Sequence, residues 1–379
     1  MIGACLCGLL LPLVASADDT QPPLSIICIE ADTGYILHEE NADLPRPPAS
    51  MLKLMLLLLV AEGLEDGHWA LDTPIPVSER AQSMGGTQVY IKSGETYPLS
   101  QMATAIAVAS ANDAAFAVGE ALWGSEEACR LRMNERAREI GMLDTEFHSL
   151  NGLPPDPGQP YDRTTARDMA ILAQWCVRKP KVMEWTGIRE FQFKQDQAIR
   201  YNTNKLLWRL PDCDGLKTGY TRAAGFCVTA TAVRNGIRLI VVIMGHESNT
   251  ERFKLAEQVL ESGFDGLKRF IFIARGQLVE PGVPITNAAR ENVRLAAADD
   301  VWLTIKDSEK DKLAVVARQP AALRAPLAKG VKAGEATVQL AGRSLATVDL
   351  VVPEEVNPAG WRWKLKKSAL RRIPAPKNQ

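Results

Sequence analysis

The sequence has few or none of the residues on which several function classes depend. It contains four histidines, and its cysteines form no C-x-x-C pair and no cluster with histidine, so we expect no metal site and no cofactor. No G-x-S-x-G stretch is present, so the usual nucleophile turn of a serine hydrolase with a histidine base is missing. The formal net charge of −1 provides no excess of positive charge for nucleic acid, and we expect no nucleic-acid partner.

Long apolar runs are also scarce. Residues 2–17 form one that ends in Val-Ala-Ser-Ala before two aspartates, a pattern typical of a secretory cleavage site. We therefore expect residues 1–17 to be a signal peptide and the mature chain to be exported. The lack of a positive charge near Met1 leaves open a short apolar helix or a misplaced start. The apolar segment 51–61 is about half as long as a membrane-spanning helix, which predicts a buried core helix.

The cysteine count limits what disulfides can contribute. Seven cysteines are present, and two of them lie within the expected signal peptide. The five that remain are Cys28, Cys129, Cys176, Cys213 and Cys227. An odd number without paired spacing indicates buried free thiols, or one disulfide whose pairing the sequence does not give.

Length and composition together indicate two domains. The chain has 379 residues, of which 46% are hydrophobic, enough for a large core. After Ile273, prolines and short alternating apolar runs replace the long helical periods, which predicts a first domain over residues 18–273 and a small β domain over 274–356. Residues 357–379 form a basic tail. Two interpretations of it stay open, a segment on an anionic membrane surface or a last strand with a solvated end.

Within the first domain, the pattern predicts elements around three short motifs. Two strand-like runs flank residues 31–34 and predict a hairpin. The apolar segment 49–63 follows three prolines and predicts a helix with Ser50 near its first turn. Helices expected over 99–108 and 111–122 place residues 110–112 in the link between them. Strands expected over 214–220, 225–233 and 238–245 include an Asn-Gly hairpin turn, and the proline-rich segment 151–163 predicts a long loop.

The first motif is Ser50-Met51-Leu52-Lys53, an S-x-x-K pattern. Residues three apart lie on one face of a helix, so Ser50 and Lys53 can bring a hydroxyl and an amine together. A lysine in water stays protonated until about pH 10.4, so Lys53 needs burial or a neighbouring positive charge to act as the base. Its apolar neighbours in the sequence can provide the burial, and Lys217 can provide the neighbouring positive charge. Taken alone, this motif is common, with serine as a helix cap and lysine as a surface charge.

The other two motifs add the remaining functions of a nucleophilic site. In Ser110-Ala111-Asn112, Ser110 can pass a proton to a leaving amine, and Asn112 can contact a catalytic side chain and a substrate amide. In Lys217-Thr218-Gly219, Lys217 and Thr218 can hold a carboxylate, and Gly219 lets a peptide backbone approach closely. Backbone N–H groups of Ser50 and Tyr220 can then form an oxyanion hole.

Two rival kinds of site fit the sequence less well. The four histidines lie in ordinary loop or strand-end settings, which indicates surface residues and not a base. No spaced pair of carboxylates stands out as an acid–base dyad either. Neither rival explains both Lys53 and Lys217.

The three motifs, in this order, are the set found in serine β-lactamases and penicillin-binding proteins. The chain resembles the low-molecular-mass penicillin-binding proteins of the D-alanyl-D-alanine carboxypeptidase type. The resemblance extends to Asp32-Thr33-Gly34, Asn151-Gly152-Leu153, Thr165-Ala166-Arg167-Asp168, Asn202-Thr203-Asn204-Lys205-Leu206-Leu207 and Ala325-Pro326-Leu327. It implies an α/β (α+β) domain of the serine β-lactamase/transpeptidase type, with a mixed antiparallel sheet flanked by helices, and a small C-terminal all-β domain.

By this resemblance, Ser50 removes the terminal D-alanine of peptidoglycan stem peptides through an acyl-enzyme, and β-lactams acylate the same serine. Lys53 is the general base, Ser110 and Asn112 are relay and substrate contact, and Lys217 and Thr218 bind the terminal carboxylate. The resemblance also implies a place in the periplasm or on the outer face of the cytoplasmic membrane. A D,D-endopeptidase and a serine β-lactamase stay open as alternatives, as does a non-catalytic peptidoglycan-binding protein. Tyr220 stands where many family members have histidine.

Overall fold

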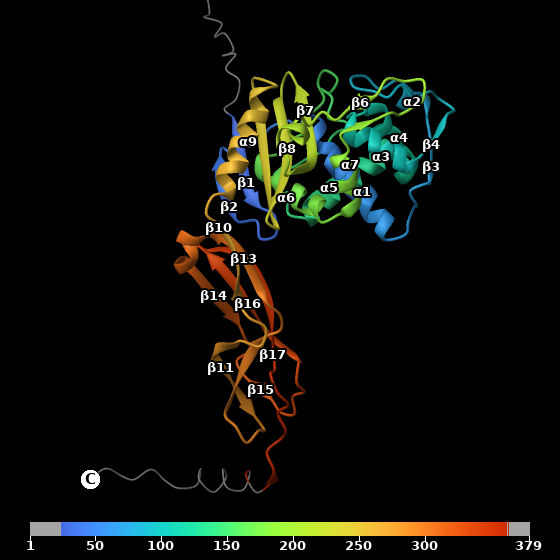
Figure 1. The fold of residues 1–379 in the computed structure, drawn as a ribbon. Coiled ribbons are helices and arrows are strands. Elements are labelled where there is room, and N and C mark those ends of the chain that lie inside the picture. Colours follow the sequence, from blue (N-terminus) through green and yellow to red (C-terminus); the bar gives the residue numbers. More distant parts are fainter. Residues whose placement is uncertain (1–23, 362, 364–379) are drawn as a thin grey trace, which may run out of the picture.

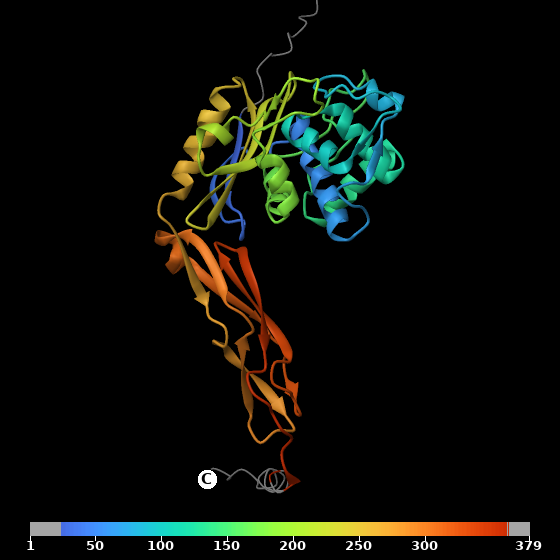
Figure 2. The same cartoon turned by 45° about the vertical axis from the view of Figure 1, so that its right-hand side comes forward.

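The computed structural model describes residues 24–361 and residue 363. The expected signal peptide lies outside the described residues, and so does most of the basic tail. The described chain forms a helix-rich domain and, below it in Figures 1 and 2, an elongated β domain. None of the described helices has the length and apolar character needed to cross a membrane.

A five-stranded antiparallel sheet forms the centre of the first domain. Its spatial order is β2-β1-β9-β8-β7. The strands are β1 (Ser25–Glu30), β2 (Ile36–Glu40), β7 (Cys213–Thr221), β8 (Gly225–Arg234) and β9 (Ile237–His246). The predicted hairpins are confirmed: β1 pairs with β2, and β8 pairs with β9 through a turn in which Asn235 and Gly236 have φ values of 53° and 74°. Such positive values are those that an Asn-Gly hairpin turn needs.

Alternate residues of the sheet face opposite layers, as the two-residue period of a strand requires. Leu239, Val241 and Ile243 of β9 pack against α9 (Glu251–Phe264), whereas Ile240, Val242 and Met244 face the larger core. On that second face lie α1 (Lys53–Glu65) and α6 (Ala166–Val177). The sheet is therefore covered by helices on both faces (Figure 1).

The helix α1 is the centre of this larger core. It follows the 3-10 turn η1 (Ala49–Leu52), and Leu54 to Leu58 are inaccessible to solvent. A helix that is apolar on all sides is stable only when surrounded. Besides α6, four helices lie against α1: α3 (Leu99–Val108), α4 (Asn112–Trp123), α5 (Glu126–Glu139) and α7 (Pro180–Gly187). Farther out lie α2 (Glu79–Gln82), which packs against α4, and two short strand pairs, β3 (Pro74–Pro76) with β4 (Thr96–Pro98) and β5 (Glu190–Phe191) with β6 (Arg200–Tyr201). Helix α8 (Leu206–Arg209) lies on the other face of the sheet, in the same apolar core as α9.

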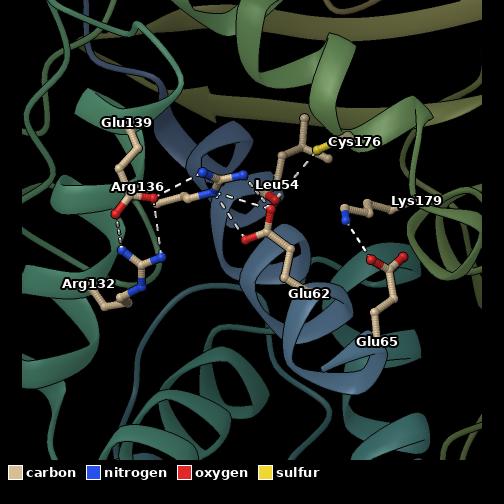
Figure 3. Close-up of polar contacts among 8 residues, drawn as sticks. All are labelled: Leu54, Glu62, Glu65, Arg132, Arg136, Glu139, Cys176 and Lys179. Atoms are coloured by element: carbon tan, nitrogen blue, oxygen red, sulfur yellow. Dashed lines mark hydrogen bonds and ion pairs between the residues drawn. The ribbon is translucent and has the colours of Figure 1, made fainter. Parts of the chain in front are cut away.

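Ion pairs fix the far end of α1 to its neighbours (Figure 3). Arg136 of α5 donates to Glu62 with an N–O distance of 2.7 Å, and both side chains are largely buried. Arg136 also contacts Glu139, and Lys179 pairs with Glu65. Partly buried pairs of this kind contribute more than exposed ones, so they hold the orientation of α1, at whose other end Ser50 lies.

Several predicted elements agree with the structure, and two boundaries differ. The helix expected over residues 111–122 is α4, which begins at Asn112, so only Ala109 to Ala111 form the link after α3. Ser110 has a φ of 58° in that link. The β structure of the second domain begins at Leu267 rather than after Ile273. The reason is that β10 (Leu267–Ile273) pairs along its length with β13 (Val301–Lys306).

The second domain is built from β10, β13 and a six-stranded sheet of order β14-β16-β17-β12-β11-β15. Its strands are β11 (Leu278–Thr286), β12 (Asn292–Ala297), β14 (Leu313–Arg318), β15 (Leu323–Arg324), β16 (Lys332–Leu340) and β17 (Arg343–Val351), with the 3-10 turn η2 (Asp307–Lys312) before β14. It has its own apolar core around Leu295, Leu303 and Leu350. The predicted fold class, an α/β domain followed by a small β domain, is confirmed.

All five cysteines within the described residues are free and buried. Burial raises the pKa of each thiol, to about 12 for Cys28 and to about 11 for Cys213 and Cys227. A thiol with such a pKa stays protonated at neutral pH and is a poor nucleophile. The cysteines therefore act as core residues, one of the two outcomes that the sequence left open.

Candidate active site

The three motifs meet at one end of α1, between the helices and the edge strand β7. Ser50 lies in η1, one turn before Lys53 on the same helical face. Ser110 comes from the link between α3 and α4, Asn112 from the start of α4, and Lys217 from β7. Strand β7 packs directly against η1. The fold thus brings together residues that are more than 160 positions apart in the sequence.

Lys53 is the centre of the site and is completely buried. Its Nζ lies 2.9 Å from Ser50 Oγ, 2.5 Å from Asn112 Oδ1, 3.0 Å from the carbonyl oxygen of Ser110 and 3.4 Å from Ser110 Oγ. The amide of Asn112 is oriented by a 2.8 Å hydrogen bond from its Nδ2 to the Gly85 carbonyl. All four neighbours of the amine are therefore oxygen atoms. Two of them, the Ser110 carbonyl oxygen and Asn112 Oδ1, can only accept hydrogen bonds.

This arrangement fits a neutral amine. Burial lowers the pKa of Lys53 well below its usual value, and the positive charge of Lys217 lowers it further, while Asp113 acts in the opposite direction. A neutral amine has two N–H groups and one lone pair. Asn112 Oδ1 and the Ser110 carbonyl can take both hydrogens, which leaves the lone pair free to accept the proton of Ser50.

Ser50 itself is partly exposed, so a substrate can reach its oxygen. Besides Lys53, its Oγ contacts the carbonyl oxygen of Asn151 at 3.4 Å. Asn151 belongs to the segment 151–165, which contains no helix or strand, as the sequence predicts. The start of this segment is fixed by Asp162, which accepts hydrogen bonds from His148 N, Ser149 N and Ser149 Oγ.

Gly152 and Gly219 are required by the close approach of their segments to η1. Gly152 has a φ of 77°, and a Cβ there would lie 2.2 Å from the Ala49 carbonyl oxygen. A Cβ on Gly219 would lie 2.7 Å from the Pro48 carbonyl oxygen. Access of the substrate backbone at Gly219 stays a prediction, whereas the structure shows that the enzyme's own chain at Pro48 needs a glycine there.

Lys217 is the second buried cation. Its ammonium donates to the Thr218 carbonyl at 3.1 Å. Burial, together with the positive charge of Arg252, lowers its pKa to about 7. Thr218 donates through its hydroxyl to Thr203 Oγ1 at 2.7 Å, and Thr203 lies in the segment between β6 and α8. The two residues predicted to hold a carboxylate thus lie side by side on β7.

Tyr220 follows on the same strand and is 56% exposed. Its ring stacks on Phe226 of β8, with ring centroids 4.2 Å apart and planes inclined by 22°. The phenol therefore stands at the rim of the site. Its backbone N–H remains our predicted donor of the oxyanion hole, together with that of Ser50.

Two residues that support the site, Asp113 and Arg252, had no role in the sequence analysis. The carboxylate of Asp113 accepts hydrogen bonds from the backbone N–H groups of Val89, Ile91 and Ala114, and it thereby fixes the segment 89–91 to the start of α4. Arg252 donates to the carbonyls of Gly219 and Cys227 at 3.0 and 2.7 Å and lies behind Lys217. A signal for Arg252 exists: it precedes Ala256 and Leu260 at four-residue spacing, so it stands on the buried face of α9.

No group of histidine, cysteine, aspartate and glutamate side chains suited to a metal ion occurs in the part of the chain that the structure describes. The groups that the motifs bring together are a hydroxyl, a buried amine and a second buried cation. Such a site can form and hydrolyse an acyl-enzyme on a substrate that carries a carboxylate.

Comparison with known proteins gives matches over both domains. The model of the D-alanyl-D-alanine carboxypeptidase family (peptidase S11) matches residues 14–248, and the model of the C-terminal domain of penicillin-binding protein 5 matches residues 270–358. The D-alanyl-D-alanine carboxypeptidase DacF of Bacillus subtilis (strain 168) is 31% identical over 348 residues, which are 91% of this chain and 88% of that protein. DacA of Escherichia coli (strain K12) is 29% identical over 340 residues, with coverage of 88% and 83%.

Solved structures of penicillin-binding proteins are similar to this chain in fold. Penicillin-binding protein 5 of Haemophilus influenzae superposes with a TM-score of 0.74 and 26% identity over 90% of this chain and all of that chain. Penicillin-binding protein D2 of Listeria monocytogenes, solved in an ampicillin-bound form, has a TM-score of 0.58 and 31% identity over 64% of this chain and 96% of that chain. The similarity thus includes proteins observed with a β-lactam.

Proposed function

The chain belongs to the D-alanyl-D-alanine carboxypeptidase family of serine peptidases, and from this premise we propose that Ser50 releases the terminal D-alanine from peptidoglycan pentapeptide stems. The protein is a serine-type hydrolase that also binds β-lactams. The observation that carries the assignment of the site is the 2.9 Å distance between Lys53 Nζ and the partly exposed Ser50 Oγ, in surroundings that favour a neutral amine.

The reaction follows from this geometry. Ser50 Oγ loses its proton to Lys53 and attacks the carbonyl carbon of the bond between the two D-alanines. The negative charge on the carbonyl oxygen is met by the backbone N–H groups of Ser50 and Tyr220. The C–N bond then breaks, Ser110 passes the proton from Lys53 to the leaving nitrogen, and D-alanine departs. Water finally hydrolyses the ester on Ser50, with Lys53 again as the base.

Substrate binding uses the residues on β7. Lys217 and Thr218 bind the carboxylate of the terminal D-alanine, and Asn112 hydrogen-bonds a substrate amide while it holds Lys53. Gly219 leaves the strand edge accessible to the stem peptide, which can lie alongside β7. The carboxylate group of penicillins meets the same pair of residues, which explains why these compounds acylate the same serine.

The test is the product of a pentapeptide muropeptide, identified by mass spectrometry. Release of one D-alanine is the expected result, and the variant Ser50→Ala, which removes the nucleophile, should release none and take up no fluorescent penicillin. Ser149→Ala is not a suitable control, because that hydroxyl anchors the loop at Asp162. Ser93→Ala, an exposed serine, is the matched control and should behave as the unmodified chain.

Three other results would change the assignment. Retained penicillin labelling of Ser50→Ala would remove Ser50 from its role. Cleavage of cross-linked stems in preference to pentapeptides would make the protein an endopeptidase, and rapid loss of the bound penicillin would indicate a β-lactamase.

We also propose that the chain acts outside the cytoplasmic membrane, in the periplasm or on the outer face of that membrane. The apolar run at residues 2–17 and a cell-wall substrate support this proposal. The mature protein should begin at Asp18, and an N-terminus at Met1 in the cell would contradict the proposed export.

For the basic tail, residues 357–379, we propose contact with an anionic membrane surface. Flotation with anionic vesicles that survives deletion of residues 357–379 would exclude that role.

A further inference from the structure

Three exposed aromatic side chains lie beside the active site without a place in the mechanism. Tyr90, Tyr201 and Trp208 are 60%, 57% and 45% exposed. Exposed aromatic rings are enriched at binding surfaces, because one part of the ring is apolar and the other part can meet water or polar groups. We call these three residues, with Arg200 and Lys205, the aromatic ladder.

Two cations alternate with the three rings. The guanidinium carbon of Arg200 lies 5.5 Å from the centre of the Tyr90 ring, and Lys205 Nζ lies 4.9 Å from Trp208 and 6.0 Å from Tyr201. Lys205 also donates to the carbonyl of Asn202. Within residues 24–361 and 363, no carboxylate forms an ion pair with either cation. Each ring of the ladder therefore has a positive charge beside it, Arg200 at Tyr90 and Lys205 at Tyr201 and Trp208.

An acidic residue does stand close to the ladder. Glu190 faces Tyr201 across the β5–β6 hairpin and is exposed. It makes no ion pair with Arg200 or Lys205, so it does not cancel their charge.

Both segments of the ladder also carry active-site contacts. Thr203, two residues after Tyr201, accepts the hydrogen bond of Thr218. Thr87, three residues before Tyr90, accepts the backbone N–H of Asn112 through its carbonyl. Gln197 ties the two segments together, because its Nε2 donates to the Val89 carbonyl at 3.0 Å.

The ladder thus borders the site on the side of Asn112 and Thr218. Strand β6, which contains Arg200 and Tyr201, lies at the end of the first domain away from the β domain (Figure 1).

Resting on the proposed function, we propose that the aromatic ladder binds the glycan strand of peptidoglycan next to the stem peptide being cleaved. Sugar rings present flat C–H faces that stack on aromatic rings, and their hydroxyl rims accept hydrogen bonds from arginine and lysine. Carboxylates of the stem peptides give the polymer a negative charge, which complements Arg200 and Lys205. The ladder therefore distinguishes a sugar-bearing stem from a free peptide of the same sequence.

The test compares two substrates in the full chain: a disaccharide-pentapeptide and the same pentapeptide without sugar. For Tyr90→Ala and Tyr201→Ala we expect KM for the disaccharide-pentapeptide to rise about five- to tenfold with kcat unchanged, because the lost stacking affects binding and not the chemistry. Both constants for the sugar-free peptide, and the rate of penicillin acylation, should stay unchanged.

Trp302→Ala is the matched control. Trp302 lies in the β domain, is 47% exposed and carries Arg269 at 5.3 Å from its ring, so it repeats the local chemistry away from the site. This variant should leave KM unchanged for both substrates. An equal rise of KM on both substrates in the ladder variants, or no rise on either, would overturn the proposal.

A second measurement needs no catalysis and separates this inference from the proposed function. The Ser50→Ala chain should co-sediment with purified insoluble peptidoglycan. A chain that carries Tyr90→Ala and Tyr201→Ala in addition to Ser50→Ala should bind severalfold less. Equal co-sedimentation would overturn the ladder even if D-alanine release is found. Failure of the unmodified chain to release D-alanine from either substrate would instead overturn the proposed function.

Discussion

The two buried lysines of the site need opposite charge states. In the proposed mechanism, Lys53 is neutral when it takes the proton of Ser50, whereas Lys217 is charged when it binds a carboxylate. Burial favours the neutral form of both, and the charge of Lys217 makes the neutral form of Lys53 still more favourable. The proposed mechanism therefore requires a pH above the pKa of Lys53 and below that of Lys217.

The opposite charge states of Lys53 and Lys217 predict a bell-shaped dependence of kcat/KM on pH. Activity falls at low pH as Lys53 becomes protonated, and it falls at high pH as Lys217, with a pKa of about 7 in the free enzyme, loses its charge. Arg252→Gln removes the positive charge that lowers the pKa of Lys217, so the alkaline limb should move to higher pH. The measurement is the pH profile of kcat/KM for a pentapeptide.

Arg209→Gln is the control for this profile. It removes an arginine that pairs with Glu257 at the surface, and it should leave both limbs in place. An alkaline limb that stays fixed or moves to lower pH in Arg252→Gln would contradict the electrostatic coupling.

Lys217 also carries a prediction for stability. Its pKa is about 7 in the folded chain and near 10.5 in the unfolded chain, so the unfolded chain binds more protons between these values. The free energy of unfolding should therefore rise with pH across this window. Lys217→Met removes the buried amine, and we expect it to raise the free energy of unfolding at pH 7 by about 1 to 4 kcal/mol. Chemical denaturation at several pH values measures both effects.

The same variant tests the carboxylate role. Lys217→Met should lose activity mainly on substrates with a free C-terminal carboxylate. An equal loss on a C-terminally amidated substrate would count against that role, and a drop in the free energy of unfolding would contradict the stability argument.

At the scale of elements, the site depends on how closely two segments approach η1. Strand β7 passes Pro48 so closely that only glycine fits at position 219, and the segment 151–165 passes Ala49 in the same way at position 152. The position of Ser50 is therefore fixed from both sides. A side chain inserted at either contact must move η1 and with it the nucleophile.

Gly152→Ala tests this contact. The new Cβ would lie 2.2 Å from the Ala49 carbonyl, so we expect the rate of penicillin acylation to fall by about 100-fold or more, since misplacement of a nucleophile by 1 Å has effects of this size. Gly158→Ala is the matched control, because Gly158 has a φ of 86° and open space around its Cα.

Both glycine variants should lose about 1 kcal/mol of stability from the positive φ, but Gly158→Ala should retain its acylation rate. Similar acylation rates in the two variants would show that the contact at Ala49 does not position Ser50.

At the scale of the whole molecule, the two domains have separate apolar cores and a small shared contact. Tyr35 of the first domain donates to Glu309 of the second, and Arg343 contacts Glu39 at 3.3 Å. Tyr35 also packs with Ile305 and Leu340 in a small apolar cluster. Since all residues of the proposed active site lie in the first domain, we expect the β domain to take no part in the chemistry.

Leu303→Ala tests this independence. Leu303 is fully buried in the core of the β domain, so its truncation should lower that domain's stability by about 3 kcal/mol. We expect calorimetry to show a lower midpoint for one of two transitions, with an unchanged rate of penicillin acylation. Leu57→Ala, in the core around α1, should shift the other transition. A loss of acylation in Leu303→Ala would show that the domains are coupled.

The sequence alone determined the parts of this protein that depend on near neighbours. The spacing of Ser50 and Lys53 places both on one helical face, and the Asn235-Gly236 turn joins two strands, because each depends only on backbone geometry within a few residues. Only the tertiary structure decided which groups surround the amine. The burial of Lys53, and the places of Asp113 and Arg252 behind the site, come from segments far apart in the chain, and a pKa depends on burial and charge in space rather than on order in the sequence.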